Sequence, residues 1–249
     1  MDLQSDPGPT SSHTLHEADV LMQLTFDRLT GGYGSADVVR GVSGTAVSGK
    51  VLCVIGRNGV GKSTLMKLLF GFLPCRGGSV SLDGREIQRL DPTDRHRRGI
   101  SYSPQERPVF DSLSVRDNLT LMRHDRSIDL FEPYFARFPL LSQRLGQHAG
   151  TLSGGERKLL SFTRALAEDL PLVLLDEPSE GVQWENILHM AAVVDERKAA
   201  GTTFVVVEQN LAFAERIADG YLVMDQGRVV LEGGRDGIGR DELMAHLHV

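Results

Sequence analysis

The sequence is poor in cysteine and in long apolar runs, and each shortage excludes a class of protein. Only two cysteines occur among 249 residues. Cys53 lies in an apolar run and Cys75 follows Pro74, so no disulfide framework is expected and a reducing compartment is indicated. No apolar stretch approaches the roughly 20 residues that cross a bilayer as a helix. We therefore expect any role at a membrane to depend on a partner.

The chain also lacks an excess of positive charge: its formal net charge is −6 and its pI about 5.8. Such a chain has no basic field to hold a phosphate backbone through counterion release, so nucleic acid is not an expected partner. The opening "MDLQSDPGPTSSH" has neither a basic region nor an apolar core, and is not expected to be a signal peptide. Residues 1–19 are predicted to be a disordered tail, and residues 20–249 a single domain.

Short β-rich apolar runs alternate with helical patterns, which is typical of an α/β fold. Strands are predicted at 50–56, 78–84, 99–105, 170–177 and 202–208, a helix at 62–72, and a hairpin at 220–234 around "DQG". The runs "LVLL" and "FVVV" are almost continuously apolar, as in central strands of a parallel sheet. Between about 106 and 152 strand signals vanish, which predicts an inserted helical subdomain.

The stretch "GRNGVGKST", residues 56–64, matches G-x-x-x-x-G-K-[ST] between a predicted strand and a predicted helix. Its glycines let backbone N–H groups turn inward and, with the helix dipole, cradle phosphate oxygens. Lys62 would reach the β and γ phosphates, Ser63 would ligate Mg²⁺, and Thr64 would add a donor to the α phosphate. The residues expected to contact ATP here are Gly56, Asn58, Gly59, Gly61, Lys62, Ser63 and Thr64. The alternative is a glycine-rich turn that binds nothing.

A second motif, "LVLLDE", places Asp176 and Glu177 at the carboxyl end of an apolar strand, where ligands bind in open α/β sheets. Two carboxylates there are costly unless a cation or a reaction uses them. Asp176 is predicted to hold Mg²⁺, and Glu177 to polarise the attacking water as general base. The alternative is an acidic turn that caps the next helix.

A third stretch, "TLSGGERKLLSFTRAL" at 151–166, begins like a helix with Ser153 as its cap. It is similar to the "LSGGQ" signature of the ATP-binding-cassette (ABC) ATPases, and the chain from about Leu21 onward resembles that family's nucleotide-binding domain. The resemblance implies a P-loop α/β fold: a mixed, mostly parallel sheet flanked by helices, with an inserted helical subdomain and an antiparallel β part.

The same resemblance implies a head-to-tail dimer, in which Ser153, Gly154 and Gly155 of one subunit donate to the γ phosphate held by the other. Tyr33 matches the family's adenine-stacking aromatic, although it could be a turn tyrosine. Gln105 matches the glutamine that contacts Mg²⁺ and begins the subdomain that docks on a membrane partner. The implied metal ligands are thus Ser63, Gln105 and Asp176.

Three positions depart from the common family pattern: Gln183 replaces the usual Asp, Gln209 the usual His, and Glu156 the usual Gln. "GRNGVGK", "EGVQ" and "VEQ" resemble the ATPases of branched-chain amino acid importers and of their urea and short-amide relatives, and the closing "DELMAHLHV" resembles the urea-transporter ATPases. Implied partners are transmembrane permeases, a second identical or sister ATPase and, indirectly, a periplasmic solute-binding protein. The implied location is peripheral, on the cytoplasmic face of the inner membrane.

The strand that ends in "VEQN" is expected beside "LVLLDE", which would bring Glu208 and Gln209 close to Glu177 and the γ phosphate. A neutral amide can donate and accept hydrogen bonds but cannot carry a proton, so Gln209 would orient and sense while Glu177 removes the proton. Two other functions stay open. One is a soluble ABC ATPase of DNA repair, translation or iron-sulfur assembly; the other is a nucleotide-binding interaction module with weak hydrolysis.

Overall fold

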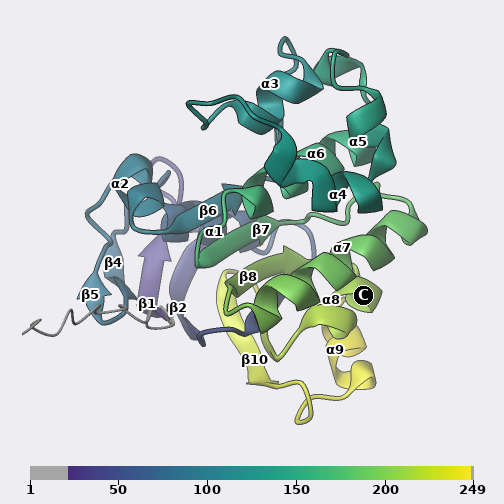
Figure 1. Cartoon of the computed structure of the whole chain (residues 1–249). Helices are drawn as coiled ribbons and strands as arrows, with labels where there is room; N and C mark the ends of the chain where they lie inside the picture. Colours follow the sequence, from purple (N-terminus) through teal and green to yellow (C-terminus); the bar gives the residue numbers. More distant parts are fainter. Residues whose placement is uncertain (1–21, 248–249) are drawn as a thin grey trace, which may run out of the picture.

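The computed structural model describes residues 22–247, and the predicted tail at 1–19 lies outside them (Figure 1). The strands are β1 (Leu24–Gly31), β2 (Val39–Ala46), β3 (Val51–Ile55), β4 (Gly77–Leu82), β5 (Arg85–Glu86), β6 (Ile100–Ser103), β7 (Leu172–Asp176), β8 (Thr203–Glu208), β9 (Gly220–Asp225) and β10 (Arg228–Gly234). The helices are α1 (Lys62–Phe70), α2 (Pro92–Arg97), α3 (Val115–Thr120), η1 (Asp129–Phe131), α4 (Glu132–Arg137), α5 (Pro139–Gln143), η2 (Ala149–Thr151), α6 (Gly154–Ala167), α7 (Trp184–Ala199), α8 (Leu211–Ile217) and α9 (Arg240–Leu247).

The larger sheet has the strand order β10-β9-β3-β8-β7-β6, in which every pair is parallel except β9 with β10. Every residue of β3, β7 and β8 is buried, as expected of strands covered on both faces. The predicted hairpin is confirmed: β9 and β10 are joined through Gln226 (φ 46°) and Gly227 (φ 79°). Two positive φ angles in a two-residue turn match the twist of the paired strands.

Strand β3 shows how the two faces are filled. Successive side chains of a strand point to opposite faces. Val51, Cys53 and Ile55 belong to one apolar cluster with α6, α7 and α8, whereas Leu52 and Val54 belong to a second cluster with α1 and the smaller sheet. Figure 1 shows α7 and α8 side by side over the first of these faces. The core therefore consists of two layers divided by the larger sheet.

The smaller sheet is antiparallel, with the order β2-β1-β4-β5. The sequence patterns located β4 but neither β1 nor β2. The pairing of β1 with β2 shifts register between Phe26 and Thr30, and Arg28 within that stretch has φ 46°. Such bulges interrupt the alternation by which a strand is recognised in a sequence.

Between β6 and α6 the structure has short helices, turns and one isolated bridge, in the region predicted as a helical subdomain. Within this region the helix-like stretch "YFARFPLLSQRLG", residues 134–146, does not form one helix. It divides into α4 and α5 at Phe138, whose φ of −123° and ψ of 67° leave the helical region. The residue before a proline is disfavoured there, and Pro139 follows.

The functional motifs share one edge because the central strands are parallel. Ile55 at the end of β3 pairs with Glu208 at the end of β8, and Asp176 at the end of β7 pairs with Val207. The loop before α1, the acidic residues after β7 and the amides after β8 therefore meet at the carboxyl edge. No helix of the described chain is long and apolar enough to cross a bilayer.

Candidate active site

The loop between β3 and α1 is shaped for an anion. Gly61 immediately before α1 has φ 108°, a conformation that favours glycine. A Cβ at Gly56 would lie 2.4 Å from the Met224 carbonyl oxygen, so a larger residue does not fit. The first turn of α1 carries no acidic side chain. The loop N–H groups and the positive helix end thus remain suited to phosphate.

Lys62 lies beneath this loop with only 3% of its surface exposed. Its Nζ donates to the carbonyl oxygens of Gly56 (2.8 Å) and Arg57 (3.0 Å) and lies 3.2 Å from Glu177 Oε1. Thr64 is buried one residue beyond Ser63, while Asn58 and Gly59 are exposed at the loop's tip. The structure therefore brings the lysine and the expected base into direct contact.

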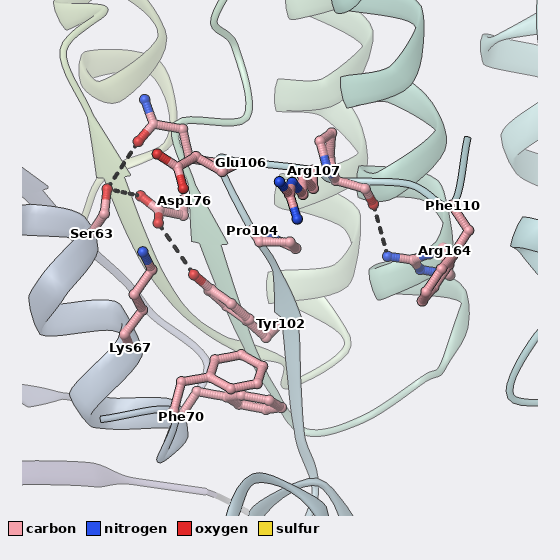
Figure 2. Close-up of a pocket in the computed structure, with 13 residues that line it drawn as sticks. Ser63, Lys67, Phe70, Tyr102, Pro104, Glu106, Arg107, Phe110, Arg164 and Asp176 are labelled. Atoms are coloured by element: carbon pink, nitrogen blue, oxygen red, sulfur yellow. Dashed lines mark hydrogen bonds between the residues drawn. The ribbon is translucent and has the colours of Figure 1, made fainter. Parts of the chain in front are cut away.

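Three oxygen-bearing side chains meet beside the start of α1. Ser63 Oγ lies 2.9 Å from Asp176 Oδ1 and 3.0 Å from Gln105 Oε1 (Figure 2). A hydroxyl has one proton, so it donates to only one of these oxygens. An all-oxygen set of this kind is what Mg²⁺ prefers, and these residues fit such an ion. Burial raises the pKa of Asp176 above its ordinary value, which is the cost of placing a carboxylate here without a cation.

Tyr102 is a site residue that the sequence patterns did not identify. Its hydroxyl donates to Asp176 Oδ2 over 3.2 Å, and burial raises the tyrosine's pKa. The sequence offered only a single tyrosine in the predicted strand before Gln105. It did not indicate that this strand, β6, lies beside β7, so the contact with Asp176 could not be foreseen. The hydrogen bond fixes the rotamer of Asp176 toward Ser63.

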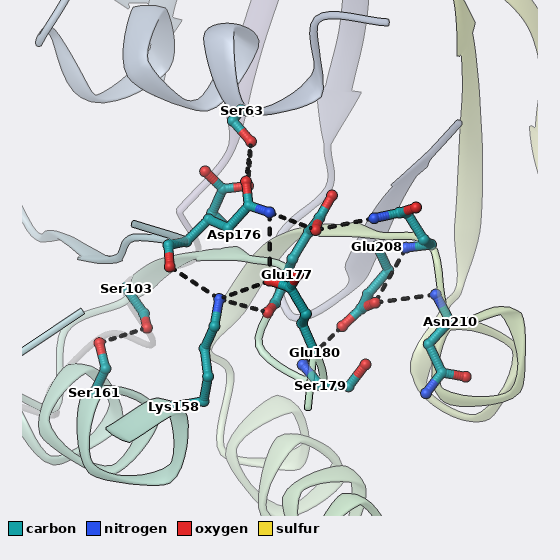
Figure 3. Close-up of polar contacts among 12 residues, drawn as sticks. Ser63, Ser103, Lys158, Ser161, Asp176, Glu177, Ser179, Glu180, Glu208 and Asn210 are labelled. Carbon is teal, nitrogen blue, oxygen red and sulfur yellow. Dashed lines mark hydrogen bonds and ion pairs between the residues drawn. The ribbon is translucent and has the colours of Figure 1, made fainter. Parts of the chain in front are cut away.

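Glu177 is the centre of the polar network in Figure 3. It is 3% exposed, and its Oε2 accepts from Gln105 Nε2 (2.7 Å) and from Gln209 Nε2 (3.0 Å). Its backbone φ of 47° is unusual for a residue with a side chain. The structure thus gathers Lys62, Gln105 and Gln209 around the carboxylate of Glu177.

The Glu208 carboxylate holds the backbone turn after β8 in the conformation that directs Gln209 toward Glu177. Its carboxylate accepts backbone N–H groups of Ser179 (3.0 Å), Gln209 (3.1 Å) and Asn210 (3.1 Å). The side chain is 2% exposed, and burial raises its pKa to about 7. Glu208 therefore connects the end of β8 to the loop after β7, a role that its position in "VEQN" did not reveal.

The signature residues open α6 but do not contact Lys62 or Ser63 through any hydrogen bond found among residues 22–247. Ser153 accepts from the Glu156 backbone N–H (3.2 Å), and Glu156 accepts from the Ser153 backbone N–H (2.8 Å), which forms a capping box. A Cβ at Gly155 would lie 2.3 Å from the Gly181 carbonyl oxygen, whereas Gly154 has open space. Glu156, which replaces the usual glutamine, thus caps the N-terminus of α6.

Tyr33 lies in the loop between β1 and β2, 47% exposed. Its hydroxyl accepts from Lys67 Nζ over 3.1 Å, which raises the pKa of Lys67. Because Lys67 lies one turn beyond Ser63 on α1, the Tyr33 ring stands near the start of that helix, and the Lys67 Nζ lies 5.6 Å from the centre of the ring. Gln183, at the start of α7, is exposed and its side chain makes no capping bond to the helix.

A pocket of about 520 Å³ continues from the oxygen cluster (Figure 2). It is lined by the residues Ser63, Lys67, Phe70, Phe72, Tyr102, Pro104, Gln105, Glu106, Arg107, Pro108, Phe110, Arg164 and Asp176. Arg164 donates to the Pro108 carbonyl oxygen (2.9 Å) and lies over the Phe110 ring, 6.0 Å from its centre. The pocket therefore joins the oxygen cluster to an apolar, arginine-edged surface.

Comparison with known proteins agrees with this geometry. A family model described as "ABC transporter" matches residues 39–180. The high-affinity branched-chain amino acid transport ATP-binding protein BraG of Pseudomonas aeruginosa is 34% identical over 212 residues, which cover 84% of this chain and 91% of BraG. The lipopolysaccharide export system ATP-binding protein LptB of Escherichia coli is 30% identical over 237 residues, which cover 91% of this chain and 96% of LptB.

A solved structure described as the ATP binding subunit of an ABC transporter is also similar. It has a TM-score of 0.78 and 28% identity, covering 90% of this chain and 98% of that one. The predicted ABC ATPase fold is thereby confirmed. The chain belongs to the ABC ATPases, as an ATP-hydrolysing, ATP-binding subunit of an ABC transporter.

Proposed function

We propose that this subunit powers the import of a small polar solute: a branched-chain amino acid, urea or a short amide. The observation that carries the proposal is the contact between Gln209 and Glu177, since "VEQ" at this strand end marks the importer branch that the chain resembles. The similarity to BraG favours a branched-chain amino acid within this group. The second candidate is lipid export, which the similarity to LptB supports.

The arrangement around Glu177 supports a division of labour in hydrolysis. When ATP enters, Lys62 exchanges the Gly56 and Arg57 carbonyl oxygens and Glu177 for the β and γ phosphates. Glu177 Oε1 is then released for the attacking water, while Oε2 stays held by Gln105 and Gln209. Glu177 would act as general base and Gln209 would orient it. Mg²⁺ held by Ser63, Gln105 and Asp176 would neutralise charge on the phosphates.

The remaining proposed roles concern contacts with adenine, with a second ATPase subunit and with a permease. The exposed ring of Tyr33 would stack on adenine, and Ser153, Gly154 and Gly155 would donate to the γ phosphate bound by a second ATPase subunit. We propose that a permease segment docks on the apolar rim of the pocket in Figure 2, which leaves Ser63, Gln105 and Asp176 to the metal ion. Phe72 and Phe110 at its rim are both more than half exposed. The subunit would then lie on the cytoplasmic face of the membrane, with a solute-binding protein opposite.

The experiment is uptake into proteoliposomes that contain the subunit, its permeases and its solute-binding protein. We expect ATP-dependent uptake of labelled leucine, urea or acetamide, with leucine favoured. ATP hydrolysis by the purified subunit and by the complex is measured in parallel. Extraction of lipopolysaccharide in place of uptake would refute the import proposal, and absence of hydrolysis in both preparations would refute the assigned residue roles.

A further inference from the structure

Lys158 is a buried lysine at the junction of the segments that form the site. It belongs to α6 and is 7% exposed. Helical spacing puts it on the stripe that also carries Phe162 and Ala165, both buried. A lysine on a buried stripe is unusual, because the ammonium loses its hydration there unless partners replace the water.

The structure supplies the ammonium group with two hydrogen-bond acceptors and one ion-pair partner. Lys158 Nζ donates to the carbonyl oxygens of Glu177 (3.0 Å) and Gln105 (3.1 Å), and lies 3.5 Å from Glu180 Oε2 (Figure 3). The first two partners are backbone atoms that no substitution of their own side chains removes. Two hydrogen bonds to backbone atoms restrict the position of the ammonium group.

Two of these partners are residues whose side chains meet at the centre of the site. Glu177 stands in a left-handed backbone conformation, at φ 47°, which the surroundings must maintain. Gln105 reaches Ser63 with one side-chain atom and Glu177 with the other. Lys158 therefore fixes the two backbones from which the expected base and its amide partner extend.

The start of the same helix carries the signature. The capping residue Ser153 and the residues Gly154 and Gly155 begin α6, and Lys158 follows within about one turn and a half. A helix of this length moves as a rigid unit, so a displacement of its first turn displaces the ammonium. Lys158 thus lies between the expected base of this subunit and the surface expected to meet the nucleotide of a partner subunit.

We propose that Lys158 is a positioning residue that couples the signature helix to Glu177 and Gln105. When the nucleotide of a partner subunit contacts the signature, Lys158 would then place the Glu177 carboxylate of this subunit in its working position. The inference rests on the proposed arrangement of two subunits around ATP. Lys158 would touch neither of the two nucleotides of the proposed dimer and would act through the backbones of Glu177 and Gln105. A purely structural role would instead affect folding and turnover together.

The test compares Lys158→Met, Lys158→Arg and a control, Lys198→Met. Lys198 lies on α7 and pairs with Asp195 and Asp219, so its loss removes a partly buried lysine that touches none of the site residues. Each variant is measured for thermal stability, ATP dissociation constant and kcat. Methionine fills a similar volume without charge but leaves the Glu177 and Gln105 carbonyl oxygens without this donor, so some loss of stability is expected. Turnover is therefore compared below the unfolding transition of each variant.

For Lys158→Met we expect kcat to fall by about tenfold or more, because small misplacements of a base are costly. The dissociation constant for ATP should change less than about twofold, since Lys62 and the loop still hold the phosphates. Lys158→Arg should recover most of the turnover, and Lys198→Met should resemble the wild type. Turnover unchanged in folded Lys158→Met, or lost equally in the arginine variant, would overturn the proposal.

Hydrogen exchange supplies a readout that does not depend on hydrolysis. In Lys158→Met, the backbone amides of residues 105–107, of Glu177 and of residues 179–181 should exchange faster, while those of α7 should not change. Unchanged exchange in both segments would overturn the coupling. A wild-type subunit that never hydrolyses ATP would contradict the proposed function, whereas a normal wild type with a normal Lys158→Met would contradict this inference alone.

Discussion

Gln209 directly follows β8 and has a side chain that cannot carry a proton, yet its Nε2 donates to Glu177 Oε2 over 3.0 Å. The amide can therefore orient the carboxylate without competing for the proton that the carboxylate must take. A histidine at this position could titrate near neutral pH, but glutamine cannot. In the proposed mechanism, proton removal therefore falls to Glu177 alone.

Replacing Gln209 with alanine tests this assignment. Gln209→Ala should slow steady-state ATP hydrolysis by about tenfold, as loss of one donor in such sites does, with little change in ATP binding. Asn210→Ala is the matched control, because Asn210 Oδ1 caps α8 through the Phe213 N–H (3.3 Å) and has no contact with Glu177. The control should lose about 1 kcal/mol of stability and keep its turnover. Equal rates for Gln209→Ala and wild type would show that Gln209 only ends the strand.

Glu208 gives a pH-dependent contribution to stability whose sign follows from its raised pKa. Burial moves its pKa from the ordinary 4.5 to about 7, so in this interval the folded chain holds a proton that the unfolded chain releases. Its contribution is full below pH 4.5 and is lost as the pH rises through about 7, by at most roughly 3 kcal/mol. Denaturant unfolding of wild type and Glu208→Gln between pH 4.5 and 8 measures the difference. A difference independent of pH would contradict the raised pKa.

At the scale of elements, the first turn of α6 lies in close contact with the loop between β7 and α7. A Cβ at Gly155 would lie 2.3 Å from the Gly181 carbonyl oxygen, while a Cβ at Gly154 meets nothing within 4 Å. Gly155→Ala should therefore lose about 1–3 kcal/mol through overpacking. Gly154→Ala, the matched control, should keep the stability of the wild type or exceed it. Thermal or urea unfolding decides, and equal stability of the two variants would contradict the contact.

The elements differ in how far the sequence could predict them. Strands β3, β7 and β8 were predictable because each is an apolar run that ends at a polar functional motif. Helix α1 was predictable because it begins with the lysine and serine of the phosphate-loop motif. Strands β1 and β2 were not, because the irregular backbone at Arg28 interrupts the alternation. The roles of Tyr102, Lys158 and Glu208 depend on contacts between segments distant in the chain. No local pattern carries that information.

For the molecule as a whole, the proposed dimer has a built-in reporter. Trp184 is the single tryptophan of the sequence, follows Gln183 at the start of α7, and is 52% exposed. The preceding loop contacts Gly155 of the signature, so a partner that meets the signature should also cover this ring. ATP should shift tryptophan emission of Glu177→Gln to shorter wavelength. ADP should not, and an identical spectrum with ATP and ADP would contradict a dimer closed over this surface.

The central claim is that ATP is hydrolysed at the carboxyl edge of the larger sheet with Glu177 as the base. The most direct measurement is steady-state ATP turnover by Glu177→Gln beside the wild type, with the oligomeric state determined by size-exclusion chromatography in ATP. Glutamine keeps the size of the side chain but cannot accept the proton. The variant should bind ATP, accumulate as a dimer and lose nearly all turnover. Turnover at the wild-type rate would contradict the claim.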